Sequence, residues 1–208
     1  MTAKPYSEAC ERNRAPILDV LREAFAAARE VLEIGSGTGQ HAVYFAQHLP
    51  HLTWHASDLP EHHAGINAWI AEAGVANLRA PVAPVALDVR DARWPVPAVD
   101  AVFTANTLHI MDWAAVQAVF LGVAQVLNPG GTFAVYGPFN YGGQFTSDSN
   151  ARFDALLRSR GVGSGLRDFE AVDALARGSG LRFVRDVPMP ANNRTLVWRR
   201  TKGAAAAA

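Results

Sequence analysis

An apolar strand meets a glycine-rich loop at Val31-Leu32-Glu33-Ile34-Gly35-Ser36-Gly37-Thr38-Gly39-Gln40-His41. A helix-forming run, 42–47, follows directly. Glycine at alternate positions lets the backbone turn tightly and approach a ligand with no Cβ in the way. The following helix offers its free N–H groups at the same point. The stretch therefore predicts a nucleotide-like cofactor at the carboxyl end of a first parallel strand.

The spacing of the glycines separates two kinds of cofactor. A dinucleotide-binding loop, G-x-G-x-x-G, needs glycine at position 40, where this chain has Gln40. Glu33 stands two residues before the first glycine, and a carboxylate there suits an ammonium group better than a pyrophosphate. The pattern E-x-G-x-G-x-G resembles motif I of the class I S-adenosylmethionine (SAM) dependent methyltransferases. SAM carries a sulfonium and an ammonium group and no phosphate. A structural glycine turn in some other α/β protein is the alternative interpretation.

The composition is typical of one globular domain. At 208 residues the chain is long enough to bury a full sheet-and-helix core. Nineteen basic residues balance nineteen acidic ones, so no global field attracts nucleic acid or anionic lipid. The single cysteine, Cys10, excludes an intramolecular disulfide and a cysteine zinc site. The amino terminus lacks an apolar signal-peptide core, and no apolar run approaches the roughly 20 residues of a membrane span. We therefore expect a cytoplasmic protein without membrane or nucleic-acid partners, and its oligomeric state stays open.

Strands and helices alternate along the chain after a first helical segment at 7–28. Seven strands are predicted, at 31–34, 52–57, 82–87, 99–105, 132–136, 181–187 and 196–200. Helices are predicted between them at about 41–48, 61–73, 113–127, 150–160 and 168–178, with a turn at 128–131. This alternation indicates a Rossmann-like α/β fold, a seven-stranded, mostly parallel sheet with helices on both faces. The last two strands form a hairpin, which makes one edge strand antiparallel. We expect one domain over 1–202, with an amino-terminal helical lid over about 5–28 and a tail at 203–208.

Polar residues follow three of the predicted strands. Asp58 ends the second strand nineteen positions after Gly39, where a carboxylate accepts both ribose hydroxyls of a cofactor. A helix N-cap is the structural alternative for Asp58. Asp88 ends the third strand, where a carboxylate accepts from an exocyclic amine such as that of adenine; a solvated loop aspartate is the alternative. Asn106 leaves the fourth strand at the sheet edge that binds ligands in open α/β folds.

Several further stretches resemble one particular family. They are 11–18 (ERNRAPIL), 106–110 (NTLHI), 136–139 (YGPF), 145–154 (FTSDSNARFD), 165–168 (GLRD) and 189–193 (MPANN). Together with the glycine loop, they resemble the methyltransferase-like protein 26 family, also known as the domain of unknown function DUF938, over residues 5–200. The resemblance implies a class I methyltransferase fold and SAM binding, and it supplies no substrate. The cofactor contacts that it implies are Glu33, Gly35, Ser36, Gly37, Gly39, Asp58, Asp88 and Asn106, with the Val89 backbone and the Leu59 side chain against the adenine ring.

Residues for the methyl acceptor are expected on the segments around this cofactor site. The predicted substrate-binding residues are Tyr6, Arg12, Asn13, His109, Phe139 and Tyr141. His109 follows the fourth strand and titrates near neutral pH, which suits a general base; a histidine packed on the next helix is the alternative. Arg12 suits an acceptor carboxylate, and a surface salt bridge is its alternative. No cluster of carboxylates, histidines or cysteines predicts a metal site.

We therefore predict a SAM-dependent methyltransferase that acts on a small-molecule acceptor. A compact chain with no appended domain and no basic surface pattern favours a small acceptor. An oxidoreductase of the NAD type is disfavoured because Gln40 breaks the dinucleotide spacing. Two alternatives stay open: a methyltransferase of protein or RNA, and a SAM-binding protein without catalysis.

Overall fold

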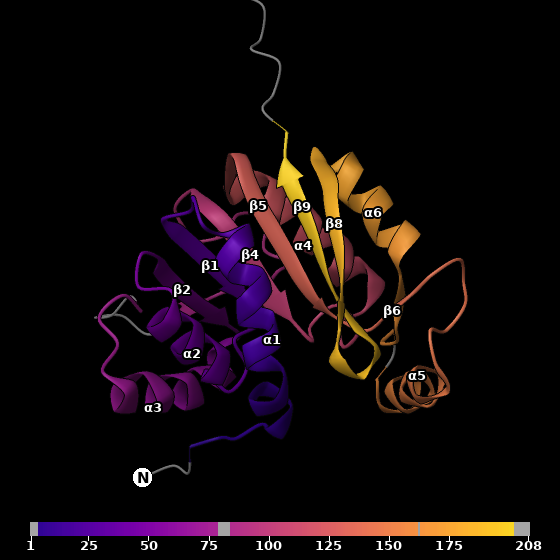
Figure 1. Cartoon of the computed structure of the whole chain (residues 1–208), viewed down its shortest axis with the longest axis horizontal. Coiled ribbons are helices and arrows are strands. Elements are labelled where there is room, and N and C mark those ends of the chain that lie inside the picture. Colours follow the sequence, from indigo (N-terminus) through magenta and orange to yellow (C-terminus); the bar gives the residue numbers. More distant parts are fainter. Residues whose placement is uncertain (1–3, 79–83, 162, 202–208) are drawn as a thin grey trace, which may run out of the picture.

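The computed structural model describes residues 4–78, 84–161 and 163–201. Its centre is a seven-stranded sheet in the order β3-β2-β1-β4-β5-β9-β8 (Figure 1). The strands are β1 (Glu30–Ile34), β2 (Thr53–Asp58), β3 (Val85–Ala86), β4 (Val99–Ala105), β5 (Leu127–Gly137), β8 (Leu181–Met189) and β9 (Asn193–Arg200). Neighbours from β3 to β5 pair in parallel, and β9 pairs antiparallel with both β5 and β8. The predicted seven-stranded, mostly parallel sheet is confirmed.

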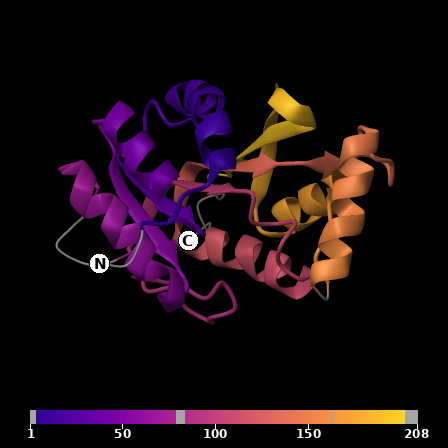
Figure 2. The ribbon, with the colours of Figure 1, turned by 90° about the horizontal axis from the view of Figure 1, so that it is seen from below.

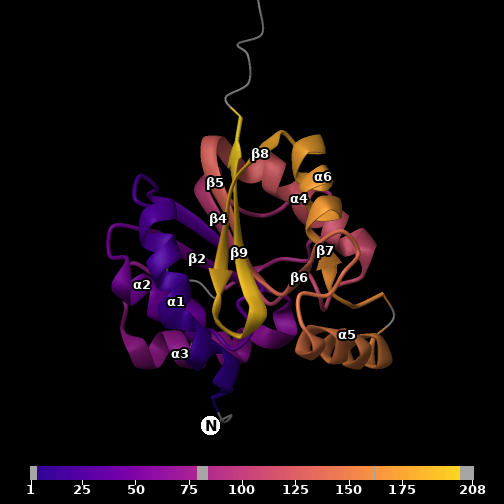
Figure 3. The same cartoon turned by 45° about the vertical axis from the view of Figure 1, so that its right-hand side comes forward.

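Helices cover both faces of this sheet (Figures 1 and 3). They are α1 (Glu8–Ala24), α2 (Gln40–His48), α3 (His63–Ala73), α4 (Trp113–Val126), α5 (Asp148–Arg160) and α6 (Phe169–Gly178), with short 3-10 turns η1 (Pro60–His62) and η2 (Pro190–Asn192). One buried cluster joins α1, α2 and α3 to the sheet, and a second joins α4 and α6 to the opposite face. Among the described residues, none of these helices is both long and apolar enough to cross a membrane.

The last two strands form the predicted antiparallel hairpin, and the structure adds which of them forms the edge of the sheet. β9 lies between β5 and β8, so β8 forms that edge. The burial of the two strands explains their order: residues 195–198 of β9 are buried, whereas β8 is partly exposed along most of its length. Arg182 and Arg185 on β8 also suit an edge, because charged side chains discourage pairing with another chain.

Two further local features differ from the sequence prediction. The turn predicted at 128–131 lies inside β5 as a bulge, across which the pairing of β5 with β4 changes register. Two short strands, β6 (Phe139–Asn140) and β7 (Arg167–Asp168), form a separate parallel pair that was not predicted. The predicted strand at 82–87 is observed as β3, and its residues 82 and 83 lie outside the described residues.

The carboxyl half of α1 fixes this helix to the sheet, and its first turns lie at the carboxyl ends of the parallel strands. Ile17, Leu21 and Phe25 are fully buried, although Pro16 stands inside the helix. Ser7 caps the amino terminus by accepting a hydrogen bond from the Cys10 N–H at 3.4 Å. Figure 2, the view from below, faces the edge where the parallel strands end and α1 begins.

Candidate functional site

The three glycines of the loop after β1 have positive φ angles, for different reasons. A Cβ on Gly35 (φ 70°) would lie 2.4 Å from Thr107, and one on Gly39 (φ 90°) would lie 2.9 Å from the Cα of Ile66. Close packing against the loop after β4 and against α3 therefore requires these two glycines. Gly37 (φ 56°) has open space around its missing side chain. It is the glycine that leaves room for a ligand.

Glu33 lies beneath the loop rather than in it. Its carboxylate accepts hydrogen bonds from the Ser36 hydroxyl at 3.0 Å and from the Trp54 indole at 3.1 Å. Burial is the main cause that raises the pKa of Glu33 to about 7, and the charge of Asp58 adds to it. Ser36 also accepts from the Ser57 N–H at 3.1 Å. Glu33 and Ser36 thus tie β1, the loop and β2 together from below.

A cavity of about 550 Å³ opens where β1 to β4 end. Its walls are Ile34, Gly35, Gly37, Asp58, Leu59, His62, Leu87, Asp88, Val89, Arg90, Ala105, Asn106, Thr107, Ile110, Met111 and Asp112. Seven of the ten predicted cofactor residues are among them; Glu33, Ser36 and Gly39 are not. The volume lies within the range of roughly 300–1,000 Å³ that small-molecule sites have. We call it the first cavity.

Asp58 joins the glycine loop to the end of β2. One carboxylate oxygen accepts from the Gly37 N–H at 2.7 Å, and the other accepts from the Leu59 N–H at 2.7 Å. Each oxygen keeps a second acceptor position, because a carboxylate offers about four in all. This arrangement can receive two neighbouring hydroxyl groups without disturbing the loop.

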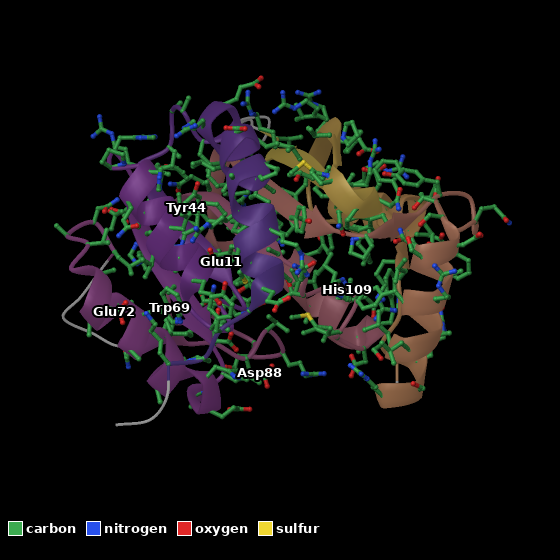
Figure 4. The ribbon with its side chains drawn as sticks, turned by 60° about the horizontal axis from the view of Figure 1, so that its bottom comes forward. Glu11, Tyr44, Trp69, Glu72, Asp88 and His109 are labelled. Carbon is green, nitrogen blue, oxygen red and sulfur yellow. The ribbon has the colours of Figure 1, made fainter. Side chains whose placement is uncertain are left out.

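Asp88 also lines the first cavity, and its side chain is more exposed than that of Asp58. It accepts from the backbone N–H of Arg90 at 2.9 Å, and the Arg90 side chain donates to Asp112 at 2.9 Å. Sequence reasoning missed Arg90 and Asp112, because their pairing across the mouth of the cavity joins two loops 22 residues apart. Figure 4 shows Asp88, together with His109 on the α4 side.

A second cavity, of about 650 Å³, adjoins the first. Its walls are Ala9, Arg12, Asn13, Asn106, Tyr136, Pro138, Ser149, Asn150, Phe153, Pro190, Ala191 and Asn193, from α1, the end of β5, α5 and the β8–β9 turn. Asn106 is the residue that both cavities share, among those described. It has a φ of 59°, which asparagine tolerates better than most residues. The two cavities therefore meet at the end of β4.

Asn13 belongs to a buried polar chain behind the second cavity. Its Oδ1 lies 2.7 Å from Nε2 of His41, and its side chain also contacts the Tyr136 hydroxyl. Burial, aided by the charge of Arg14, lowers the pKa of His41 to about 4. The ring is therefore neutral at pH 7, and Nε2–H donates to Asn13. This bond holds α1 against α2 and fixes the Asn13 side chain at the cavity wall.

His109 is buried beside both cavities and lines neither of them. Its ring meets the edge of Phe153, a wall residue of the second cavity, with 5.4 Å between ring centroids. Burial, and then the charge of Arg167, lower the pKa of His109 to about 4. The imidazole is therefore neutral at pH 7 and has a nitrogen free to accept a proton.

The other predicted substrate residues fall into two groups. Arg12 and Asn13 line the second cavity, although the Arg12 side chain is 71% exposed and bonded to Glu8 at 3.1 Å. Phe139 is buried in the core, the Tyr141 hydroxyl donates to Asp186 at 2.6 Å, and Tyr6 is exposed. None of these last three lines either cavity.

Sequence reasoning missed the wall that α5 and the β8–β9 turn contribute. Ser149, Asn150 and Phe153 lie within about one helical turn of each other on α5, a spacing that places them on one face. Asn150 donates to the backbone oxygen of Asn192 at 3.3 Å, which holds the turn against α5. The described residues contain no group of three or more potential metal ligands of the His, Cys, Asp or Glu type.

Several solved structures are similar to this chain. An O-methyltransferase family protein from Burkholderia thailandensis is 22% identical, with a TM-score of 0.81 over 95% of this chain and 59% of that one. An O-methyltransferase family 2 protein from Planctomyces limnophilus, in complex with apigenin, is 18% identical, with a TM-score of 0.80 over 93% and 58%. PigF with SAH is 18% identical, with a TM-score of 0.74 over 93% and 64%. The chain spans less than two thirds of each of these proteins.

These likenesses establish the fold, and the predicted class I methyltransferase architecture is confirmed. A family model described as "Protein of unknown function (DUF938)" matches residues 4–200. That match includes the glycine loop, the segments that line both cavities and the closing hairpin. The chain therefore belongs to the DUF938 family.

Proposed function

We propose that this protein is a SAM-dependent methyltransferase that acts on a small-molecule acceptor. The observation that carries the proposal is the pair of cavities that meet at Asn106. Methyl transfer is an in-line displacement, so donor and acceptor must approach each other from two sides of one point. When bound, SAM would supply an electrophilic methyl group on its sulfonium. The residues of the chain then have to bind, orient and desolvate the two reactants.

The first cavity fits the donor. Asp58 offers its two remaining acceptor positions to the ribose hydroxyls, and Asp88 offers its carboxylate to the adenine amine. Val89 and Leu59 provide apolar surface for the ring. Gly37 leaves open space at the loop. The PigF structure with SAH, which has the same fold, supports this assignment.

The second cavity fits the acceptor. Arg12 and Asn13 line it from α1, and Phe153 lines it from α5. For an acceptor that must lose a proton, His109 is the proposed general base, because its ring is neutral at pH 7 and lies against Phe153. The complex of a similar structure with apigenin supports a small-molecule acceptor.

The amino-terminal segment is proposed to act as the lid of this single domain. The Pro5 carbonyl accepts from the Trp69 indole at 2.7 Å, and the Lys4 ammonium lies 2.6 Å from Glu72; Figure 4 labels Trp69 and Glu72. The Ser7 N–H donates to Gln40 at 2.6 Å. Since Ile17, Leu21 and Phe25 are fully buried in the core, the part of the predicted lid that can move lies before them. Affiliation with methyltransferase-like protein 26 within DUF938 stays a prediction.

Calorimetric titration with S-adenosylhomocysteine tests the donor site. We expect the wild-type protein to bind, and Asp58→Ala to bind about tenfold to a hundredfold more weakly, because a hydrogen bond to a charged group contributes about 1.5–3 kcal/mol. Glu61→Ala is the matched control, since Glu61 is exposed and lines neither cavity. Tight binding of NADH without binding of S-adenosylhomocysteine would overturn the proposal.

Methyl-labelled SAM tests the acceptor. After incubation with a cell extract, we expect the label in the small-molecule fraction. Label in the protein or RNA fraction would favour the macromolecular alternative. Binding of S-adenosylhomocysteine with no transfer to any fraction would favour the non-catalytic alternative.

A further inference from the structure

Arg167 holds the loop that leaves β4. It belongs to β7 and pairs with Phe139 of β6, just after β5. Its Nε donates to the carbonyl oxygen of Leu108 at 3.0 Å. One terminal nitrogen donates to the carbonyl oxygens of Met111 and Gly163, the latter at 2.8 Å. A single guanidinium thus binds the backbone on both sides of His109.

The residues just before Arg167 hold the same loop. The Gly165 N–H donates to the carbonyl oxygen of His109 at 2.9 Å. Gly165 has a φ of 150°, and a Cβ there would lie 2.9 Å from Asp154 of α5. The Leu166 N–H donates to Asp154 at 2.7 Å. The segment 165–167 is therefore fastened to α5 on one side and to the loop on the other.

The loop that Arg167 holds lines the first cavity and packs against a wall residue of the second. Thr107, Ile110 and Met111 line the first cavity, and His109 packs on Phe153 of the second. A shift of this backbone would move a wall of the first cavity and the contact of His109 with Phe153 at once. Its own hydrogen bonds are few: Ile110 and Met111 donate to the Thr107 carbonyl at 3.0 and 3.3 Å. The guanidinium supplies much of the remaining support.

We propose that Arg167 is a positioning residue: it fixes the backbone from Leu108 to Met111, and so sets the His109 ring and the Ile110 and Met111 side chains against the two cavities. The inference rests on the proposed function, because it assigns Arg167 to the geometry of the methyl-transfer site.

Arginine is required here for its shape. Its donors lie in one rigid plane, whereas lysine presents a single compact ammonium group. The acceptors are carbonyl oxygens on two separate loops, and only a guanidinium, with N–H donors on several nitrogens, binds them at the same time. The guanidinium also lies 5.7 Å from the centre of the Trp113 ring, which favours a planar cation.

The charge of Arg167 acts on His109 as well. The charged groups around this pair are Asp112 at the start of α4 and Asp154 and Arg158 on α5. Burial is the larger cause of the low pKa of His109, and Arg167 is the second. Loss of the Arg167 charge should therefore raise the pKa of His109 above about 4, while burial keeps it below 6.5.

Two variants separate the shape of Arg167 from its charge. Arg167→Gln removes both the planar guanidinium and its charge, and Arg167→Lys keeps the charge without the planar guanidinium. The control is Arg177→Gln, which removes an exposed arginine on α6 that is paired only with Asp173 within the described residues. Amide hydrogen exchange of Gly165 reports the loop, and an NMR titration of His109, assigned with His109→Asn, reports the charge.

We expect Gly165 to lose protection about tenfold or more in both variants, because one hydrogen bond to a charged group contributes at least that factor. The pKa of His109 should rise in Arg167→Gln and stay near its wild-type value in Arg167→Lys. The control should change neither quantity. If the Gly165 amide of Arg167→Lys keeps its wild-type protection from hydrogen exchange, the inference is overturned. If Arg167→Gln fails to fold, Arg167→Lys still decides.

Binding of S-adenosylhomocysteine distinguishes the two proposals. We expect Arg167→Lys to bind it several-fold more weakly than wild type, because Ile110 and Met111 line the first cavity. A wild-type protein that does not bind it would refute the proposed function. Wild-type affinity in Arg167→Lys, with a loop that exchanges freely, would refute the positioning role alone.

Discussion

Glu33 makes the stability of this protein depend on pH in an unusual direction. Its carboxyl group would ionise near pH 4.5 in the unfolded chain, whereas burial raises its pKa to about 7 in the folded protein. Between these values the folded state binds more protons than the unfolded state. The free energy of unfolding therefore falls as the pH rises through this window, and the loss is complete above pH 7.

Substitution of Glu33 by glutamine measures this loss. The amide oxygen of the introduced glutamine can still accept from Ser36 and Trp54, whose hydrogen bonds to Glu33 are 3.0 and 3.1 Å long in the wild type. A shift from 4.5 to about 7, at about 1.4 kcal/mol per pH unit, corresponds to about 3 kcal/mol. The stability of Glu33→Gln relative to wild type should therefore rise by about 3 kcal/mol between pH 4.5 and pH 8.

Urea unfolding followed by tryptophan fluorescence, at several pH values from 4.5 to 8, provides the test. In a thermal scan the same change corresponds to a relative gain of roughly 6–12 °C. Glu61→Gln is the control, because Glu61 is exposed and its variant should follow the wild type at every pH. A difference between Glu33→Gln and wild type that does not vary with pH would refute the reasoning.

Three further predictions concern the loop, the buried polar chain and the β6 segment. Gly35→Ala should destabilise the protein by about 1–3 kcal/mol, measured by urea unfolding, because its Cβ would lie 2.4 Å from Thr107 at a φ of 70°; an unchanged midpoint would contradict the packing. Asn13→Ala should cost about 1–3 kcal/mol in the same assay, because it leaves the buried His41 ring without its partner; a cost below about 0.5 kcal/mol, typical of a surface substitution, would mean that water replaces it. Tyr141→Phe should leave the affinity for S-adenosylhomocysteine unchanged in calorimetry, because Tyr141 lines neither cavity; a tenfold loss would place Tyr141 in the site after all.

The grouping of residues at the first cavity, the proposed donor site, was predictable because it follows from local rules. Parallel strands end at one edge, so the glycine loop, Asp58 and Asp88 had to lie near one another wherever the helices packed. The orientation of the Glu33 side chain was harder to predict from the sequence. Val31 and Glu33 lie on the same face of β1, as residues two apart in a strand do. The Glu33 side chain is buried there because Trp54 of the neighbouring strand covers it and donates to it.

The second cavity, the proposed acceptor site, was harder to predict because its walls are brought together by the tertiary structure. Arg12 lies far from Phe153 and Asn193 in the sequence, and the three meet only through the packing of α1, α5 and the hairpin turn. The sequence placed aromatic residues after β5, but Phe139 turns into the core, and Tyr141 turns to Asp186. The position of β9 inside the sheet likewise depends on which strand of the hairpin can be buried on both faces.

Asn106 has a consequence for how such a protein can change over time. Since it is the one described residue common to both cavities, the walls of the second cavity can be exchanged with little effect on the first. Under the proposed function, substitutions in α1, α5 or the β8–β9 turn would change which acceptors bind, while the residues of the proposed donor site stay the same. An engineer who wants a new acceptor range would randomise those three segments and leave the strand ends alone.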